Sequence, residues 1–199
     1  MSFSNINLTS PAMMIDLAVV VVLIIVAIAV AIHLEKKKTA RLRGRFGPEY
    51  DAAVREAGSR KKAELALRER VKRIDGLKIR DLTGAERGRY LADWEAVQSR
   101  FIDHPRGAVT EADELVNSLL LTRGYPAGGF DQRAADVSVN HSTLVGPYRT
   151  AYGITARAGK NEATTEELRN AMIHYRTLFD ALLGANTSIE DRPLIQRTA

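Results

Sequence analysis

The chain has 199 residues, of which 45% are hydrophobic, 27% charged and 6% aromatic, a composition typical of folded proteins and not of disordered or collagen-like ones. It contains no cysteine, which excludes a disulfide scaffold, a thiolate metal centre and a cysteine nucleophile, and which fits a reducing compartment. The formal net charge is +5, and this charge is unevenly distributed along the chain.

A strongly apolar segment near the N-terminus predicts a transmembrane helix over residues 12–34. Sixteen consecutive apolar residues run from Leu17 to Ile32, and only Asp16 and His33 are strongly polar within the wider segment. At about 1.5 Å per residue, twenty helical residues cover the roughly 30 Å hydrocarbon core of a bilayer. A lone strand would leave its backbone unpaired in lipid, so we expect a helix despite the many valines and isoleucines. Residues 1–11 then form a short N-terminal tail.

The charges that flank this segment predict its orientation. No lysine or arginine precedes it, whereas six follow directly, namely Lys36, Lys37, Lys38, Arg41, Arg43 and Arg45. The positive-inside rule therefore places the N-terminus outside and the C-terminal part in the cytoplasm, with the basic cluster at the membrane surface. The competing interpretation is a signal peptide cleaved near Ala31, which the missing basic n-region and the following lysines disfavour.

Residues 35–75 form a basic juxtamembrane segment. They contain fourteen Lys or Arg and seven Asp or Glu, a local net charge of +7, while residues 76–199 have a net charge of −1. Gly47-Pro48 predicts a break after the membrane helix, Gly58-Ser59 a second break, and Asp75-Gly76 a helix end. Between Gly58-Ser59 and Asp75-Gly76, apolar residues recur at helical spacing, which predicts a basic amphipathic helix. These apolar residues are Ala63, Leu67, Val71 and Ile74.

Three uses of this segment stay open. Its apolar stripe could lie on anionic lipid head groups or against an acidic partner, or it could pack on the folded domain and leave a solvated charged face. Nucleic-acid binding is disfavoured because only Phe46 and Tyr50 could stack on bases and no binding motif is present.

The remainder predicts a small helical bundle over residues 76–184, followed by a flexible tail at 185–199. Capping-box spacings at Thr83-Glu86 and Thr164-Glu167 open two helices that run to about residues 102 and 184. Between them we expect a helix that follows Pro105 and ends at Gly124, a short one over 130–137, and a longer one over 141–157. No segment alternates apolar and polar residues as a half-buried strand would. We therefore expect an all-α protein.

The densest polar cluster after Gly124 is a speculative site; it comprises Asp131, Arg133, Asp136 and His141. A histidine with two carboxylates could act as a base or hold a metal. However, steps of five residues spread these side chains around a helix. The favoured interpretation is Asn140 and Ser142 as helix caps and Asp136 paired with a neighbouring arginine. No nucleotide, hydrolase or zinc-protease motif is present, so we assign no catalytic, cofactor or metal residue and expect no cofactor.

Three phrases of the sequence carry a resemblance. RLRGRFGPEY at residues 41–50, RGYP at 123–126 and RAADVSVNH at 133–141 together resemble a group of uncharacterised bacterial single-pass membrane proteins. The resemblance implies a bacterial cytoplasmic membrane, one N-terminal membrane helix and a small helical domain. It also directs attention to the loop from Tyr125 to His141, and it implies no activity.

The sequence thus predicts a single-pass inner-membrane protein whose cytoplasmic helical domain is a non-enzymatic scaffold or interaction module that binds another protein. Two alternatives stay open. One is a membrane-anchored enzyme or a metal- or ligand-binding domain that uses the Tyr125–His141 region. The other is binding of anionic lipids or nucleic acid through residues 35–75.

Overall fold

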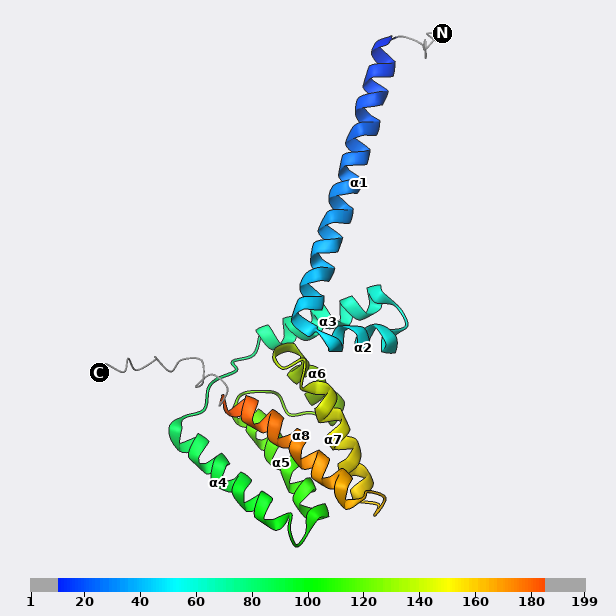
Figure 1. Ribbon diagram of the computed structural model, residues 1–199. Helices are drawn as coiled ribbons and strands as arrows, with labels where there is room; N and C mark the ends of the chain where they lie inside the picture. Colours follow the sequence, from blue (N-terminus) through cyan, green and yellow to red (C-terminus); the bar gives the residue numbers. More distant parts are fainter. Residues whose placement is uncertain (1–10, 185–199) are drawn as a thin grey trace, which may run out of the picture. The chain divides into compact units, whose positions relative to one another are not determined.

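The computed structural model describes residues 11–184, with side chains from Leu17 onward, and over that range its regular secondary structure is all α-helix, joined by loops and turns. The all-α expectation is therefore confirmed for these residues. The two predicted tails lie outside them, apart from Pro11. The chain divides into two compact units, residues 1–44 and residues 45–199. The helices, shown in Figure 1, are α1 (Pro11–Phe46), α2 (Pro48–Ala57), α3 (Arg60–Asp75), α4 (Gly84–Arg100), α5 (Pro105–Thr122), α6 (Phe130–Asn140), α7 (Val145–Ala158) and α8 (Thr165–Leu183).

Helix α1 contains the predicted apolar segment. The helix has 36 residues, about 54 Å of length at 1.5 Å per residue, so it extends well beyond the predicted span. Its stretch Leu17–Phe46 includes an 18-residue window with a mean hydropathy of 3.3, and none of that window is buried within the protein. The helix ends at Phe46 because Gly47 adopts a positive φ of 47° and Pro48 starts the next helix.

Helices α2 and α3 are joined by a short turn and pack against each other at one end of the second unit. Gly58, in the left-handed conformation at φ 63°, makes the turn between them, as the Gly-Ser break predicts. The apolar stripe of α3 faces inward, with Ala63, Leu67 and Ile74 all buried. The segment therefore packs on the domain through this stripe, and the stripe is not free to enter a membrane.

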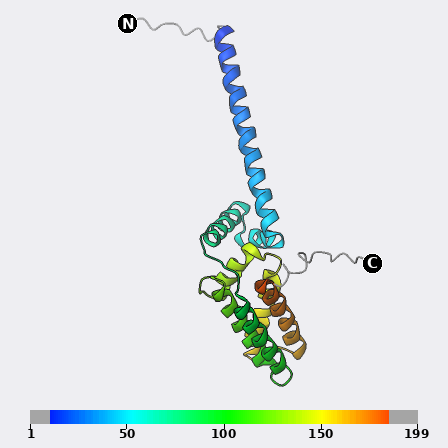
Figure 2. The ribbon, with the colours of Figure 1, turned by 90° about the vertical axis from the view of Figure 1, so that its left-hand side faces the viewer.

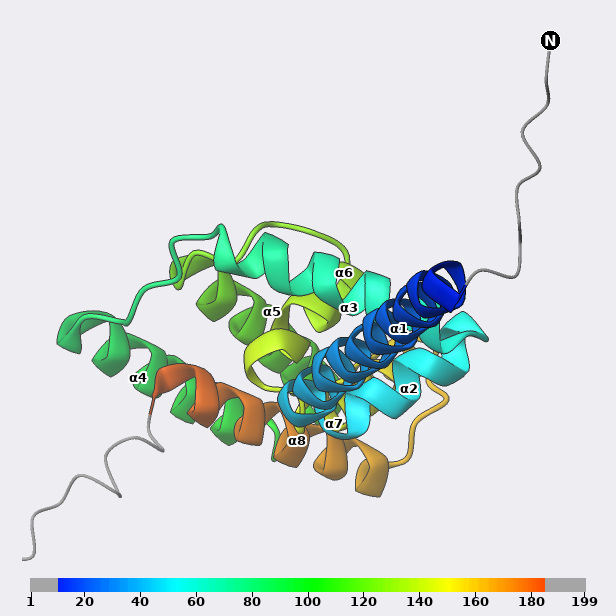
Figure 3. The same ribbon diagram turned by 90° about the horizontal axis from the view of Figure 1, so that it is seen from above.

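Helices α4, α5, α7 and α8 form the bundle and its core. Helix α8 packs on both α5 and α7, while α4 packs on α5. Figure 2 shows these helices from the side, and Figure 3 shows α4 at the edge of the bundle beside α8. The rings of Trp94 and Phe179 stack with centroids 4.8 Å apart and join α4 to α8. Both predicted capping boxes are present, Thr83 with Glu86 and Thr164 with Glu167.

Helix α6 packs against both α3 and α7. Its boundaries differ from the prediction. It continues past residue 137 to Asn140, and α7 begins only at Val145. The expectation that Asn140 and Ser142 cap α7 is wrong: the N-cap is Leu144 and carries no side-chain cap. The Asn140 amide instead donates to the Tyr125 hydroxyl at 3.3 Å, because the chain makes a turn at His141–Leu144 before α7 starts.

The linker from α3 to α4 crosses the end of α5 at very close range. Gly124 has φ 96°, and a Cβ on it would lie 2.6 Å from the carbonyl oxygen of Lys78, so only glycine fits. The Arg80 amide donates to the Arg123 carbonyl at 2.9 Å. The Arg123 guanidinium donates to the carbonyl of Leu182 at 2.9 Å. The crossing thus ties the linker, α5 and the end of α8 together.

Candidate functional site

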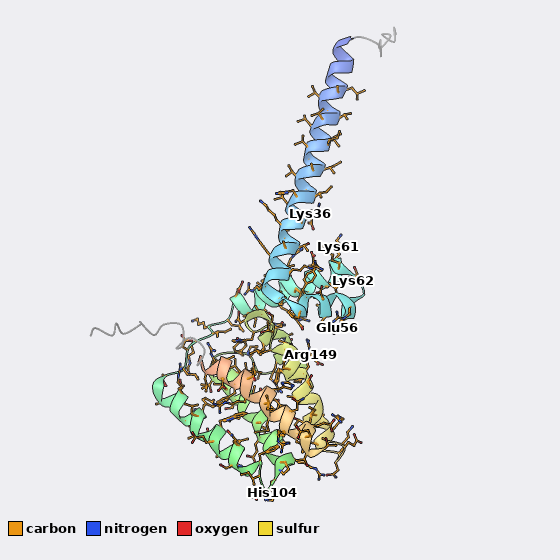
Figure 4. All side chains as sticks on the ribbon, in the orientation of Figure 1. Lys36, Glu56, Lys61, Lys62, His104 and Arg149 are labelled. Atoms are coloured by element: carbon orange, nitrogen blue, oxygen red, sulfur yellow. The ribbon has the colours of Figure 1, made fainter. Side chains whose placement is uncertain are left out.

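The buried carboxylate of Glu49 is held by two arginines from other helices. Arg149 on α7, labelled in Figure 4, donates to both carboxylate oxygens at 2.7 and 2.9 Å, and Arg70 on α3 donates at 3.2 Å. The Glu49 side chain is only 4% exposed. A charge this buried requires such partners, so the cluster joins α2, α3 and α7 and has a structural role. Glu49 and Arg149 are 100 positions apart in the sequence, so no local sequence pattern predicts their pairing.

A second buried carboxylate, Glu64, holds the α2–α3 pair together. The Tyr50 hydroxyl donates to it at 2.9 Å, and Arg60 and Arg68 each donate to it at 3.1 Å. Burial is the main cause that raises the pKa of Tyr50, and the Glu64 carboxylate adds to it. The phenol therefore stays protonated and acts as a hydrogen-bond donor. Several arginines of the basic segment are consequently engaged inside the domain.

The four residues of the speculative polar site all lie on α6 or at its end. Asp136 is buried and binds Arg73 of α3 at 2.8 Å and the Gln132 amide at 2.8 Å. Asp136 does pair with an arginine, but the expectation of a neighbouring arginine is wrong, because Arg73 lies 63 residues earlier in the chain. Asp131 is exposed, and His141 follows the last residue of α6. Among the described residues, no group of three His, Asp or Glu side chains is placed to hold a metal ion.

Arg133, the fourth of these residues, belongs to a polar cluster in the bundle core that the sequence did not indicate. Its guanidinium donates to the Tyr148 hydroxyl at 3.2 Å and to the Asp113 carboxylate at 3.4 Å. Burial raises the pKa of Asp113, and it also raises the pKa of Tyr148 to about 12 and the pKa of Tyr175 further. Both phenols therefore stay protonated, and the Tyr148 hydroxyl accepts the hydrogen bond from Arg133. Asp113 lies next to the buried stripe of α5, which is the only hint in the sequence.

The predicted membrane-surface cluster consists of exposed side chains. Lys36, Lys37, Arg41 and Arg43 are all exposed, and Lys38 lies 3.9 Å from Glu35. Arg45 differs, because it contacts the Asp75 carboxylate at 3.3 Å and donates to the Val139 carbonyl at 3.4 Å. Arg45 therefore helps to build the second unit, while its contribution to the membrane surface stays a prediction.

An apolar groove lies between α4 and α8. It has a volume of about 350 Å³ and is lined by Trp94, Gln98, Phe101, Arg169, Met172, Ile173, Arg176 and Thr177. Ile173 is 56% exposed at its edge. The Arg176 guanidinium lies 5.4 Å from the Trp94 ring centroid, a cation–π distance that holds the arginine against the groove. The lining includes two arginines and no carboxylate.

The apolar surface extends beyond the groove along α4. Leu91, 38% exposed, precedes Trp94 by about one helical turn, and Ile102, 83% exposed, follows Phe101. An apolar stripe that continues past a groove suits an elongated ligand such as a helix. The sequence did not indicate the groove, because the periodicity of apolar residues does not show which helix face lacks a neighbour.

Comparison with known proteins gives no further identification: no protein-family model, no curated protein and no solved structure matches this chain. The resemblance to bacterial single-pass membrane proteins therefore stays a prediction.

Proposed function

We propose that the chain is a single-pass protein of a bacterial cytoplasmic membrane whose second unit binds another protein on the cytoplasmic side and catalyses no reaction. The observation that carries the proposal is a membrane-length apolar helix followed by a separate helical unit that exposes an apolar groove. The first feature supplies the anchor, and the second supplies a binding surface.

The anchor is supported by the exposure of α1. The valines, leucines and isoleucines from Leu17 to Leu34 are about half or more exposed, because no other described residues cover them. In water this surface would be a strong aggregation risk, whereas a bilayer buries it and the helix satisfies its own backbone hydrogen bonds. The lysines and arginines that follow favour a cytoplasmic location for residues 45–199. A cleaved signal sequence would share the apolar segment but not the lysines directly after it.

The protein-binding role is supported by the chemistry of the groove. An amphipathic helix of another protein could place apolar side chains against Trp94, Met172 and Ile173. Carboxylates beside that apolar stripe would complement Arg169 and Arg176, whose ion pairs among the described residues are with Glu166 and Asp180 of their own helix. The Arg169–Glu166 pair is exposed, and such a surface pair within one helix contributes little and exchanges readily for a new partner. We therefore commit to an acidic amphipathic helix as the occupant.

Site-specific photo-crosslinking in cells tests this role. A photoreactive residue at Thr177, inside the groove, should give a crosslinked product with another protein in the membrane fraction. Ile173→Asp should abolish this product, because it places a carboxylate in an apolar contact beside an acidic partner. Leu121→Asp is the matched control, since Leu121 is 43% exposed on α5 and does not line the groove; it should leave the product intact.

Other results would contradict the proposal. A product with twice the mass of the chain would identify a second copy as the occupant. A product that survives Ile173→Asp would place the contact outside the groove. Loss of the product in both aspartate variants would mean that the groove has no specific role.

A further inference from the structure

The outward face of α3 is a strongly basic surface that the fold does not use. Helix α3 turns its apolar stripe inward, and its arginines Arg68 and Arg73 reach back to the buried carboxylates Glu64 and Asp136. These contacts account for the inner and flanking positions of the helix. Among residues 17–184, they leave the side of α3 that faces away from the domain without a partner.

This outward face combines three lysines with one exposed leucine. Lys61, Lys62 and Lys72 are exposed and form no ion pair with any described residue, and Leu65 is 59% exposed among them. At 100° per residue these four positions fall within an arc of about 100° on the helix. Glu69 lies in the same arc and is the one acidic residue there. Figure 4 shows Lys61 and Lys62 projecting from the helix.

Three unpaired cations around an apolar side chain are the pattern of a helix at a lipid head-group layer. The lysines attract anionic phosphates, and the leucine can enter the boundary between head groups and acyl chains. The place of α3 in the sequence favours the same occupant, since it begins only 26 residues after Leu34, the last apolar residue of the candidate span. A membrane that holds α1 is therefore within reach of α3.

We propose that the outward face of α3 binds the anionic phospholipids of the membrane that α1 enters, with Leu65 inserted among the head groups. This inference rests on the membrane anchor of the proposed function and is independent of the groove. It replaces the expected membrane contact through Ala63, Leu67 and Ile74, which are buried. Nucleic acid is the less suitable polyanion, because the face presents no aromatic side chain on which a base could stack.

The absence of cysteine from the chain allows a direct test on the full-length protein. Leu65→Cys, labelled with an environment-sensitive fluorophore and reconstituted in vesicles, should show a blue shift in mixtures of phosphatidylcholine and phosphatidylglycerol but not in phosphatidylcholine alone. High salt should reverse the shift, since the screening length falls from about 10 Å at 0.1 M to about 3 Å at 1 M. Adding Lys61→Glu, Lys62→Glu and Lys72→Glu together should abolish it. All four positions are exposed, so circular dichroism should show an unchanged helix content.

Two further labels separate the possible failures. Leu121→Cys on α5 is the matched exposed leucine and should show no shift in either lipid. Leu23→Cys in α1 should report an apolar environment in both lipids; if it reports water, the anchor itself has failed. If Leu23 is inserted and the Leu65 label does not respond to anionic lipid, the lipid-binding face is refuted while the anchor stands.

Two outcomes would assign the face to something else. A Leu65 shift of equal size in phosphatidylcholine alone would mean that the lysines are not recognised by charge, which overturns the proposal. A shift produced by a DNA or RNA oligonucleotide in phosphatidylcholine vesicles, and absent with phosphatidylglycerol, would make the surface a nucleic-acid site and overturn it as well.

Discussion

The buried carboxylates of this protein bind arginines of α3, and these ion pairs determine which basic residues of α3 remain available to other partners. Glu49, Glu64 and Asp136 each take up at least one arginine from α3. Removing one partner of such a pair leaves an uncompensated charge in a poorly solvated place, which is far more costly than losing a surface pair. The arginines of α3 are therefore structural, and its lysines are the residues left for binding.

His141 gives the domain a pH dependence whose sign follows from its surroundings. Burial, and secondly the positive charge of Arg123, lower the pKa of His141. The unfolded chain, with a histidine pKa of about 6.5, therefore takes up this proton before the folded protein does. The contribution of neutral His141 to the stability of the folded protein is fully present above a pH of about 6.5. It is lost as the pH falls through the lowered pKa of His141 in the folded state.

Replacing His141 with glutamine tests this linkage. Urea unfolding, followed by circular dichroism from pH 8 down to mildly acidic pH, should show a stability loss in the wild type that is smaller in His141→Gln. Because other groups also titrate, the difference between the two proteins is the measured quantity. Equal slopes in both would refute the assigned role of His141.

Helix ends show how far local sequence determines the elements. In α8 the Thr164 hydroxyl accepts from the Glu167 amide at 3.3 Å, and the Glu167 carboxylate accepts from the Thr164 amide at 2.8 Å. Hydrogen bonds from Thr164 and Arg157 lower the pKa of Glu167 to about 2. The same arrangement opens α4. At the start of α7, by contrast, no side chain caps the helix.

This contrast predicts unequal effects of two similar substitutions. Thr164→Ala should destabilise the domain by about 1 kcal/mol, the usual contribution of an N-cap hydroxyl. Ser142→Ala, which removes the hydroxyl that the sequence suggested as a cap, should change stability by less than about 0.5 kcal/mol. Thermal or urea unfolding of the full-length protein measures both. A larger loss for Ser142→Ala than for Thr164→Ala would contradict the structure at both helix ends.

The parts of the structure that the sequence predicted are those encoded within a few residues. The capping boxes, the Gly-Pro break before α2 and the apolar stripe of α3 that includes Ala63 and Leu67 are local patterns, and each agrees with the structure. The turn before α7 was missed because Asn140 turns to Tyr125, a partner 15 residues away. The pairing of Glu49 with Arg149 and the open groove beside Trp94 depend on which helix faces meet. A single sequence does not specify that for this chain.

At the scale of the whole molecule, the proposed function requires that the two units lie in different environments. Helix α1 is long and apolar enough to cross a membrane, while the second unit has its own buried core and a charged surface. The predicted arrangement has residues before the span outside the cell and residues 45–199 in the cytoplasm. A membrane location is suggested by α1, and the orientation stays a prediction.

Cysteine labelling measures that orientation without background, since the natural chain has none. In intact bacterial spheroplasts, a membrane-impermeant maleimide should label Ser4→Cys and should label Lys160→Cys only after lysis. Both proteins should remain in the membrane pellet after alkaline extraction. Labelling of Lys160→Cys in intact spheroplasts, or recovery of the unprocessed chain in the soluble fraction, would refute the topology.

The crossing at Gly124 has a mechanical consequence for an anchored protein. A pull transmitted through α1 enters the second unit at Arg45 and would reach α7 through α2 and the bidentate contact of Arg149 with Glu49. A second route for the force runs through the α3–α4 linker, which lies in close contact with Gly124. Arg123 joins this crossing to the last turn of α8 through its hydrogen bond to the Leu182 carbonyl. Force is thereby divided between two routes that end on different helices. The unit should resist shear as one block instead of peeling apart helix by helix from its tethered end.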